Sequence, residues 1–150
     1  MYAIEYFAPP EREPTGVCRL MAAYERVNYA DVEPVSGAMR SLTESLGSEQ
    51  VGVSMVRCEP GWRNEPHDHV ADDHEEVYVL LEGEATVVVD DDSVSMEPGD
   101  AVWIPPRATR QIRTSETDSA FVLISAPASQ CRTTTCTNDV DSWSADGFVG

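Results

Sequence analysis

The second half of the chain is a series of short apolar runs separated by turn residues, and this pattern most limits the possible folds. Val51, Val53 and Met55 lie two residues apart, the period at which side chains share one face of a β-strand. Further runs occupy residues 77–81, 85–89, 93–96, 101–104, 109–114 and 120–125. Roughly seven or eight strands at spacings of about 8–12 residues are typical of an antiparallel sandwich or barrel. The pattern therefore predicts an all-β fold.

The length fits one domain with short additions at both ends. A chain of 150 residues buries roughly 68–70% of the surface that it exposes when unfolded. We expect an N-terminal extension at 1–26, a barrel at 27–126 and a C-terminal tail at 127–150. Residues 27–34 are expected to form a short strand and turn, and 39–46 a brief helix or turn. Residues 4–7 either belong to the extension or add an edge strand to their own or a partner subunit.

The chain is strongly acidic. Asp and Glu number 27 against 10 basic residues, which gives a formal net charge of −17, and all the basic residues are arginine. Such a charge argues against nucleic acid or an anionic membrane surface as a partner. It is also typical of proteins that work in molar salt, where the Debye length falls from about 8 Å to about 3 Å and charge repulsion is screened. Salt adaptation is therefore expected, with an ordinary acidic cytosolic protein as the alternative.

The cysteine spacing does not indicate a redox or zinc motif. No two of Cys18, Cys58, Cys131 and Cys136 form a CxxC pair, and all four lie outside the histidine cluster. We expect buried or idle thiols, although Cys131 and Cys136 are close enough to close a small loop. No apolar run reaches the length of a secretory or membrane-spanning segment. A reduced, cytoplasmic protein is predicted.

All three histidines of the chain gather just before one apolar run. His67 and His69 are two residues apart, so on an extended backbone their side chains leave the same face with Cα atoms roughly 6.5–7 Å apart. Metal–nitrogen bonds are about 2.0–2.1 Å long, so a third ligand must come from elsewhere in the fold. Glu76 begins the next predicted strand and offers a carboxylate. Two histidines and one carboxylate suit iron and zinc, with manganese also tolerated.

Glycines flank this cluster at regular distances. Five residues separate Gly61 from His67, and six residues separate Glu76 from Gly83. This arrangement resembles the first signature motif of the cupin superfamily, which implies a double-stranded β-helix, or jelly-roll, barrel with His67, His69 and Glu76 as metal ligands. The family usually has three or four residues between its second histidine and the glutamate, whereas here six intervene. Either the loop carries two extra residues, or the third histidine of the cluster, His74, replaces one of the ligands.

Residues 99–114 resemble the second cupin motif, with changes at its functional positions. Arg107 stands where the family has a glycine, Arg110 where it has a metal-binding histidine, and Thr114 where it has an asparagine. The resemblance thus implies a degenerate metal site that lacks its third imidazole. It also implies that Arg110 points into the barrel, where a guanidinium offers only hydrogen-bond donors.

Three functional hypotheses follow from the resemblance. The first is a binding protein for a small anionic ligand, contacted by Arg110, Tyr78, Trp103 and Gln111. Either the site has lost its metal and the histidines hydrogen-bond the ligand, or the ligand lies between the metal ion and Arg110. The second is a metal-dependent enzyme of the dioxygenase, isomerase or decarboxylase type, with zinc, manganese or iron at the site. In the third, the histidines are only polar residues of a loop rim. The resemblance also implies pairing of two barrels through their sheets as a homodimer.

Overall fold

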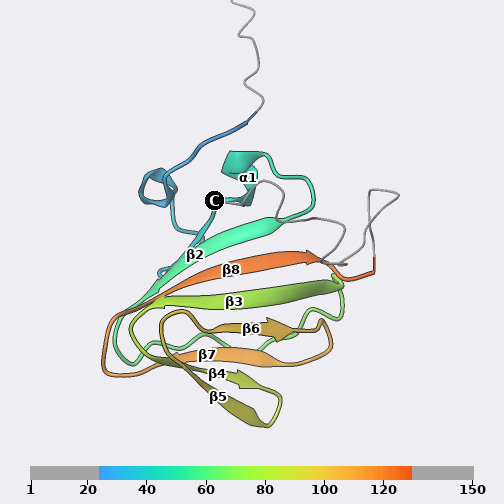
Figure 1. Ribbon diagram of the computed structural model, residues 1–150. Coiled ribbons are helices and arrows are strands. Elements are labelled where there is room, and N and C mark those ends of the chain that lie inside the picture. The colour runs from blue at the N-terminus through green and yellow to red at the C-terminus, as the bar shows by residue number, and fades with distance from the viewer. Residues whose placement is uncertain (1–23, 130–150) are drawn as a thin grey trace, which may run out of the picture.

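The computed structural model of the protein describes residues 24–129, which form a jelly roll of two antiparallel sheets (Figure 1). The larger sheet has the strand order β1-β2-β8-β3-β6 and the smaller one the order β5-β4-β7. The elements in chain order are η1 (Tyr29–Asp31), β1 (Met39–Ser41), α1 (Thr43–Leu46), β2 (Gly52–Cys58), β3 (His74–Glu82), β4 (Ala85–Val89), β5 (Asp92–Met96), β6 (Ala101–Ile104), β7 (Arg110–Thr114) and β8 (Ser119–Pro127).

The predicted strands agree with the structure from residue 51 onward, with small differences at their ends. Strands β4 and β6 have the predicted bounds, while β3 and β8 are longer than the apolar runs from which they were predicted. The strand expected at 27–34 is wrong, because the Asn28 side chain accepts a hydrogen bond from the Ala30 N–H and starts the 3-10 helix η1 instead. Residues 39–46 contain both the strand β1 and the short helix α1.

The alternation of buried and outward-facing side chains along β3 places residues in both the core and the candidate site. Glu76, Tyr78 and Leu80 are buried, and the residues between them face the outside of the larger sheet. Tyr78 and Leu80 pack with buried residues of both sheets, including Val87 of β4, Ile104 of β6, Ile112 of β7 and Phe121 of β8. Because side chains alternate between faces of a strand, Glu76 points into the same interior as this core.

The loop between β2 and β3 runs along β7 and carries the histidines. Isolated antiparallel bridges join Arg63 to Arg113 and His67 to Arg110. In the second bridge, the His67 N–H donates to the Arg110 carbonyl at 3.1 Å and the Arg110 N–H donates to the His67 carbonyl at 2.8 Å. The loop begins at Gly61, whose φ of 74° lies in the left-handed region that favours glycine. The smaller sheet thereby gains a fourth extended segment that faces the end of β3.

Several predictions made from the sequence concern residues outside 24–129. They are the role of residues 4–7, most of the N-terminal extension and of the C-terminal tail, and the state of Cys18, Cys131 and Cys136. Within the described part, Cys58 is a buried free thiol, as expected for an idle cysteine. No helix between residues 24 and 129 is long and apolar enough to cross a membrane.

Candidate metal centre

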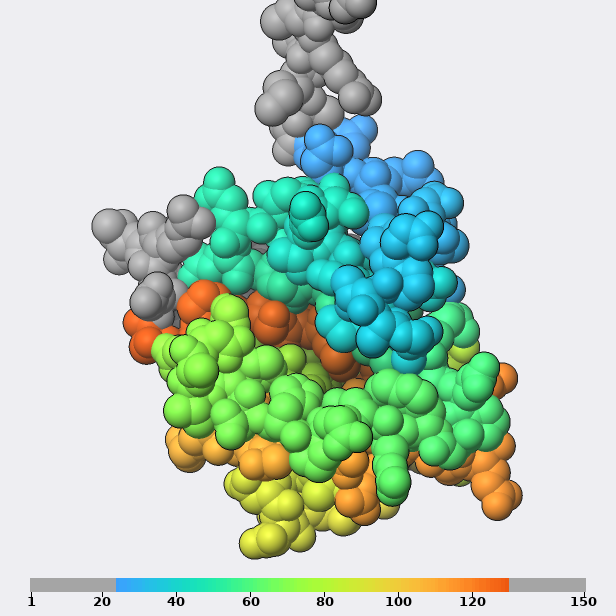
Figure 2. All heavy atoms as spheres, turned by 180° about the vertical axis from the view of Figure 1, so that it is seen from behind, coloured from blue at the N-terminus to red at the C-terminus, as the bar shows by residue number. Residues whose placement is uncertain are grey.

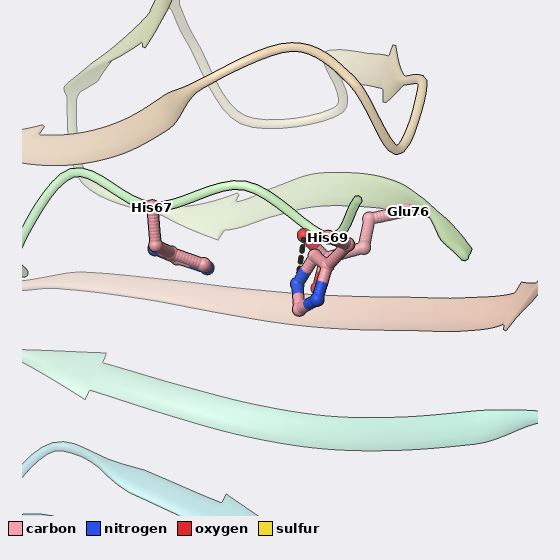
Figure 3. A group of neighbouring side chains, drawn as sticks. All are labelled: His67, His69 and Glu76. Carbon is pink, nitrogen blue, oxygen red and sulfur yellow. Dashed lines mark ion pairs between the residues drawn. The ribbon is translucent and has the colours of Figure 1, made fainter. Parts of the chain in front are cut away.

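Two imidazoles and one carboxylate converge inside one end of the barrel. His67 and His69 come from the loop before β3, and Glu76 comes from β3 itself (Figure 3). One potential ligand atom from each residue lies within 4.8 Å of the others, and His69 Nε2 is 3.4 Å from Glu76 Oε2. Ligands about 2.0–2.2 Å from an ion stand at most about 4.4 Å apart, so at most a small side-chain rotation lets all three bind one ion.

Hydrogen bonds at Nδ1 orient both rings for binding through Nε2. His67 Nδ1 lies 3.1 Å from the Glu65 carbonyl oxygen, which can only accept, so Nδ1 carries the proton. His69 Nδ1 lies 3.0 Å from each carboxylate oxygen of Asp72, which assigns its proton in the same way. Each neutral ring therefore keeps a lone pair on Nε2. His69 Nε2 is also buried without a hydrogen-bond partner, a state that a metal ion would relieve.

The third histidine stands outside this group. His74 Nδ1 lies 3.1 Å from Asp72 Oδ2, and its ring centre is 6.4 Å from that of His69. Hydrogen bonds from His74 and from His69 hold the pKa of Asp72 below its usual value. Asp72 lies in the segment that lengthens the spacing between His69 and Glu76. Of the two explanations for that spacing, the geometry favours extra loop residues over the replacement of a ligand by His74.

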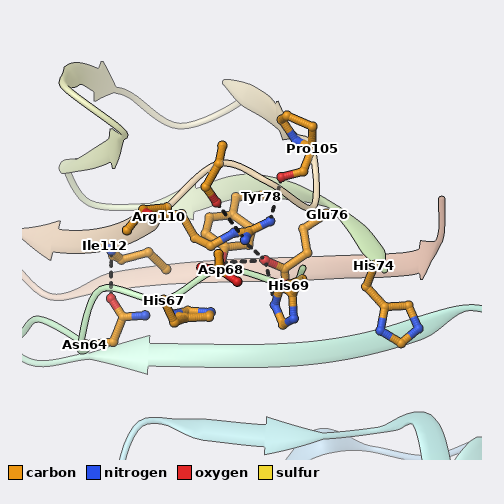
Figure 4. Close-up of polar contacts among 12 residues, drawn as sticks. Asn64, His67, Asp68, His69, His74, Glu76, Tyr78, Pro105, Arg110 and Ile112 are labelled. Carbon is orange, nitrogen blue, oxygen red and sulfur yellow. Dashed lines mark hydrogen bonds and ion pairs between the residues drawn. The ribbon is translucent and has the colours of Figure 1, made fainter. Parts of the chain in front are cut away.

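Glu76 lies in a buried polar cluster with Arg110 and Tyr78 (Figure 4). The Tyr78 hydroxyl donates to Glu76 Oε2 at 2.9 Å, and burial together with the Glu76 charge raises the pKa of Tyr78 above its usual value. Arg110 Nε lies 3.1 Å from the same oxygen, within ion-pair distance, although its N–H does not point along a hydrogen bond. The carboxylate thus has a charge partner and a neutral donor before any metal is considered.

Arg110 is fully buried and held from three sides. Besides the contact with Glu76, its two terminal nitrogens donate to the carbonyl oxygens of Ala108 at 2.9 Å and Pro105 at 3.2 Å. The inward direction expected from the resemblance is therefore observed. However, Arg110 is not among the residues that line the cavity beside the histidines. It stands behind Glu76 and neutralises that carboxylate, and it does not present its charge to a ligand.

A cavity of about 190 Å³ opens beside the ligand group. Its walls come from both sheets, the histidine loop and the segment around β1. In Figure 2 a hollow is visible between the blue and cyan N-terminal part and the green loop, with orange atoms of β8 in its depth. The lining residues are Ser36, Met39, Val56, Trp62, Asn64, His67, His69, Glu76, Tyr78, Ile112 and Leu123. The site is therefore one wall of a small cavity that is partly open to solvent.

Besides Arg110, two of the predicted ligand-binding residues, Trp103 and Gln111, do not line this cavity. Trp103 is 58% exposed on the outer face of the larger sheet, where its indole N–H donates to Glu75 at 3.0 Å. Gln111 is buried, but its amide donates to the Asn64 carbonyl and accepts from Arg113. It therefore ties the histidine loop to β7. Of the four predicted residues, Tyr78 alone lines the cavity.

The apolar part of the cavity was not predicted from the sequence. Met39, Trp62 and Leu123 belong to β1, the histidine loop and β8, which are far apart in the chain. Trp62 directly follows Gly61 of the first motif. Leu123 lies two residues after the buried Phe121, so both side chains point to the same face of β8. The sequence therefore provided a weak indication of a cavity position for these two residues. Nothing local indicated Met39, since β1 was expected to be helix or turn.

Comparisons with known proteins agree with this architecture. Residues 54–126 match the family model described as "Cupin domain". A cupin protein from Bacteroides fragilis is similar in structure, with 25% identity, a TM-score of 0.64, and 79% of this chain and 96% of that chain covered. No curated protein matches the sequence.

Two further solved structures share the fold at lower identity. A sugar phosphate isomerase from a cupin superfamily, from Silicibacter pomeroyi, has 23% identity and a TM-score of 0.57, with 67% of this chain and 74% of that chain covered. An oxalate decarboxylase variant from Bacillus subtilis has 21% identity and a TM-score of 0.59, with 70% of this chain and 30% of that chain covered. The protein has a jelly-roll cupin fold, and the comparisons support its place in the cupin superfamily.

Proposed function

We propose that the protein binds a divalent metal ion through His67, His69 and Glu76 and uses it to hold a small anionic ligand in the cavity. The observation that carries this proposal is the pair of Nδ1 hydrogen bonds, which leave both Nε2 lone pairs free beside a carboxylate. Imidazole nitrogen and carboxylate oxygen are ligands that zinc, manganese and iron accept. When bound, such an ion acts as a Lewis acid toward oxygen atoms of a ligand.

The charges at the site make anion binding depend on the metal. Arg110 and Glu76 are opposite charges in contact, so they cancel, and no other carboxylate or guanidinium lines the cavity within residues 24–129. A neutral histidine whose Nδ1 proton is engaged presents only a lone pair at Nε2, which repels a carboxylate. A divalent ion leaves a net positive site. For this reason, binding of an anion by the histidines without a metal is the weaker alternative.

The second candidate is a metal-dependent enzyme of the dioxygenase, isomerase or decarboxylase type. In its favour, two histidines and one carboxylate would hold a metal ion beside the cavity and would leave further positions of a six-coordinate ion for a substrate. Against it, the described lining offers no titratable base apart from the three ligands themselves and Tyr78, whose hydroxyl is committed to Glu76. Binding is therefore the function that the geometry supports best.

Metal titration of protein purified without a histidine tag and stripped with a chelator tests this proposal. We expect about one equivalent of Zn²⁺ or Mn²⁺ by calorimetry and elemental analysis, and loss of that binding in His67→Ala and His69→Ala. The matched control is His74→Ala, which removes the third histidine of the same cluster but no ligand. Less than about a tenth of an equivalent in the parent protein, or equal losses in all three variants, would refute the site.

Three expectations about the protein's assembly and environment also remain proposals. Homodimer formation is supported by an apolar row on the outer face of the larger sheet, formed by Val53, Ile124, Val77 and Trp103 in neighbouring strands. A reducing, cytoplasmic environment is supported by the free thiol of Cys58. Salt adaptation is supported by the net charge of −17.

A further inference from the structure

We infer that the ligand is a short monocarboxylate with a compact apolar body and a hydroxyl or oxo oxygen on the carbon next to its carboxylate. This inference rests on the proposed metal site and specifies what that site takes. The argument has three parts, which are the distribution of polar groups over the cavity wall, the lack of a second cationic contact, and the size of the space.

Polar and apolar residues occupy different parts of the cavity wall. His67, His69 and Glu76 form one side, and Met39, Val56, Trp62, Ile112 and Leu123 supply most of the rest. Two of the polar atoms near the ligand group already have partners. The Tyr78 hydroxyl donates to Glu76, and the Asn64 side-chain oxygen accepts from the Ile112 N–H. The cavity therefore offers a ligand one polar end, at the metal site. The rest of its wall is apolar and favours contact with hydrocarbon groups.

The described lining has no place for a second negative charge. It contains neither arginine nor lysine, and the nearest buried guanidinium, that of Arg110, is engaged with Glu76 and two carbonyl oxygens. A second carboxylate or a phosphate would lie against the apolar wall without a partner, and burying an unpaired charge is strongly unfavourable. Dicarboxylates and sugar phosphates are therefore poor ligands for this cavity.

The number of protein ligands favours a chelating head group. Three ligands from the chain leave adjacent open positions on an octahedral ion, which a carboxylate oxygen and a neighbouring hydroxyl or oxo oxygen can fill together. The cavity volume of about 190 Å³ is below the roughly 300–1,000 Å³ of sites for drug-sized ligands, and it equals about six water molecules at about 30 Å³ each. The apolar body is thus limited to a few carbon atoms.

Three probes of nearly equal shape separate these requirements. We choose 2-hydroxy-4-methylpentanoate as the matching compound, malate as the analogue with a carboxylate in place of the isopropyl group, and 4-methylpentane-1,2-diol as the form without a carboxylate. Calorimetry on the Mn²⁺-loaded protein, whose ion accepts six ligands, should show binding of the first at least about tenfold tighter than of malate, and no measurable binding of the diol. Chelation of the manganese should abolish binding of the matching compound.

A substitution in the apolar wall tests the same idea as a gain of function. Met39→Arg places a cation in the lining and should improve malate binding at least about tenfold, because the second carboxylate then has a partner. The charge-matched control is Ser93→Arg, at an exposed position of β5 that does not line the cavity, and it should change nothing. If Met39→Arg fails to fold, as judged by circular dichroism, the comparison of probes on the parent protein decides alone.

The outcomes distinguish this inference from the proposed metal site. If the parent protein binds no metal, the proposed function itself fails. If it binds metal but takes malate as well as or better than 2-hydroxy-4-methylpentanoate, the metal site stands and the inference about the ligand is wrong. Equal binding of the diol would also overturn the inference about the ligand, because binding would then not depend on the charge of the carboxylate.

Discussion

The imidazole of His69 is held by the carboxylate of Asp72, three residues further along the chain, with Nδ1 3.0 Å from both carboxylate oxygens. Asp72 also accepts from His74, so one exposed carboxylate joins a candidate ligand to the histidine outside the ligand group. The contact determines which nitrogen of His69 carries the proton. Asp72 is therefore a positioning residue for the metal site, located in the part of the loop that exceeds the usual cupin spacing.

Asp72→Asn should weaken metal binding without unfolding the protein. Loss of the charged acceptor makes the His69 ring less basic and leaves its orientation less restricted. Mutation of a residue that hydrogen-bonds a metal ligand in this way typically lowers metal affinity by about 10–100-fold. The matched control is Asp73→Asn, which removes the same charge one residue later, makes no contact to a histidine side chain, and retains a residue that tolerates its φ of 53°. Zinc titration by calorimetry measures both. Equal affinities for the two variants would contradict the positioning role.

Removal of Arg110 should destabilise the metal-free protein and strengthen metal binding. Arg110→Met leaves the buried Glu76 carboxylate without its cation, and breaking a buried pair in this way costs about 3–5 kcal/mol. The same change removes a repulsion of about 4 kcal/mol per unit charge at about 4 Å and an effective dielectric constant of about 20, before screening. Urea unfolding with and without Zn²⁺ measures both effects.

Arg110→His separates charge from ligand number at the same position. It removes the guanidinium as Arg110→Met does, and it offers an additional imidazole where the second cupin motif usually has one. We expect zinc affinity to rise further than in Arg110→Met. If both variants gain equally, the histidine does not reach the ion; if neither gains, Arg110 does not act on the metal site.

The buried thiol of Cys58 should make stability fall at high pH. Burial at the end of β2 raises the pKa of Cys58 to about 11, compared with about 8.5 in an unfolded chain. Because the folded pKa is the higher one, the stabilisation is complete below about pH 8.5 and is lost as the pH rises toward 11. The loss amounts to about 3 kcal/mol at most. The difference in unfolding free energy between the parent protein and Cys58→Ala, measured from pH 7 to about 11, should shrink accordingly, and a constant difference would refute it.

Salt should stabilise the protein. A net charge of −17 favours the unfolded chain through repulsion, and raising KCl from about 0.1 M to about 2 M reduces the Debye length to a few ångströms. We expect the melting temperature to rise by several degrees in differential scanning fluorimetry. Near the sequence pI of about 4.2 the effect should diminish, since the net charge vanishes there. A flat response at neutral pH would show that the acidic composition is not a salt adaptation.

The apolar row on the larger sheet should mediate self-association. Ile124 and Trp103 are 37% and 58% exposed there, and pairing two copies about a two-fold axis would bury the same row on both. Ile124→Glu should therefore convert a dimer to a monomer in light scattering. The control is Val94→Glu, at a 36% exposed valine of β5 in the other sheet. A parent protein that is monomeric at high micromolar concentration would exclude this interface.

Local sequence determined most of the strands and the chemistry of the metal group. Apolar runs bounded by turn residues placed β4 and β6 with their observed bounds, because the turn residues mark where each strand ends. The spacing of His67 and His69 was sufficient to nominate a metal site. At residues 27–34 local reasoning failed, since apolar composition cannot show that Asn28 caps a turn of 3-10 helix.

Tertiary structure alone decided the partners of those residues. The register of β3 against β6 pairs Val77 with Trp103 and thereby turns the indole outward, which the composition of 101–104 does not reveal. The contact of Arg110 with Glu76 joins β7 to β3, and the cavity wall combines residues from β1, β2, β3, β7, β8 and the histidine loop. These relationships depend on how the two sheets fold over each other. The sequence by itself therefore determined which groups are available for chemistry, and the packing of distant strands decided which of them face one another.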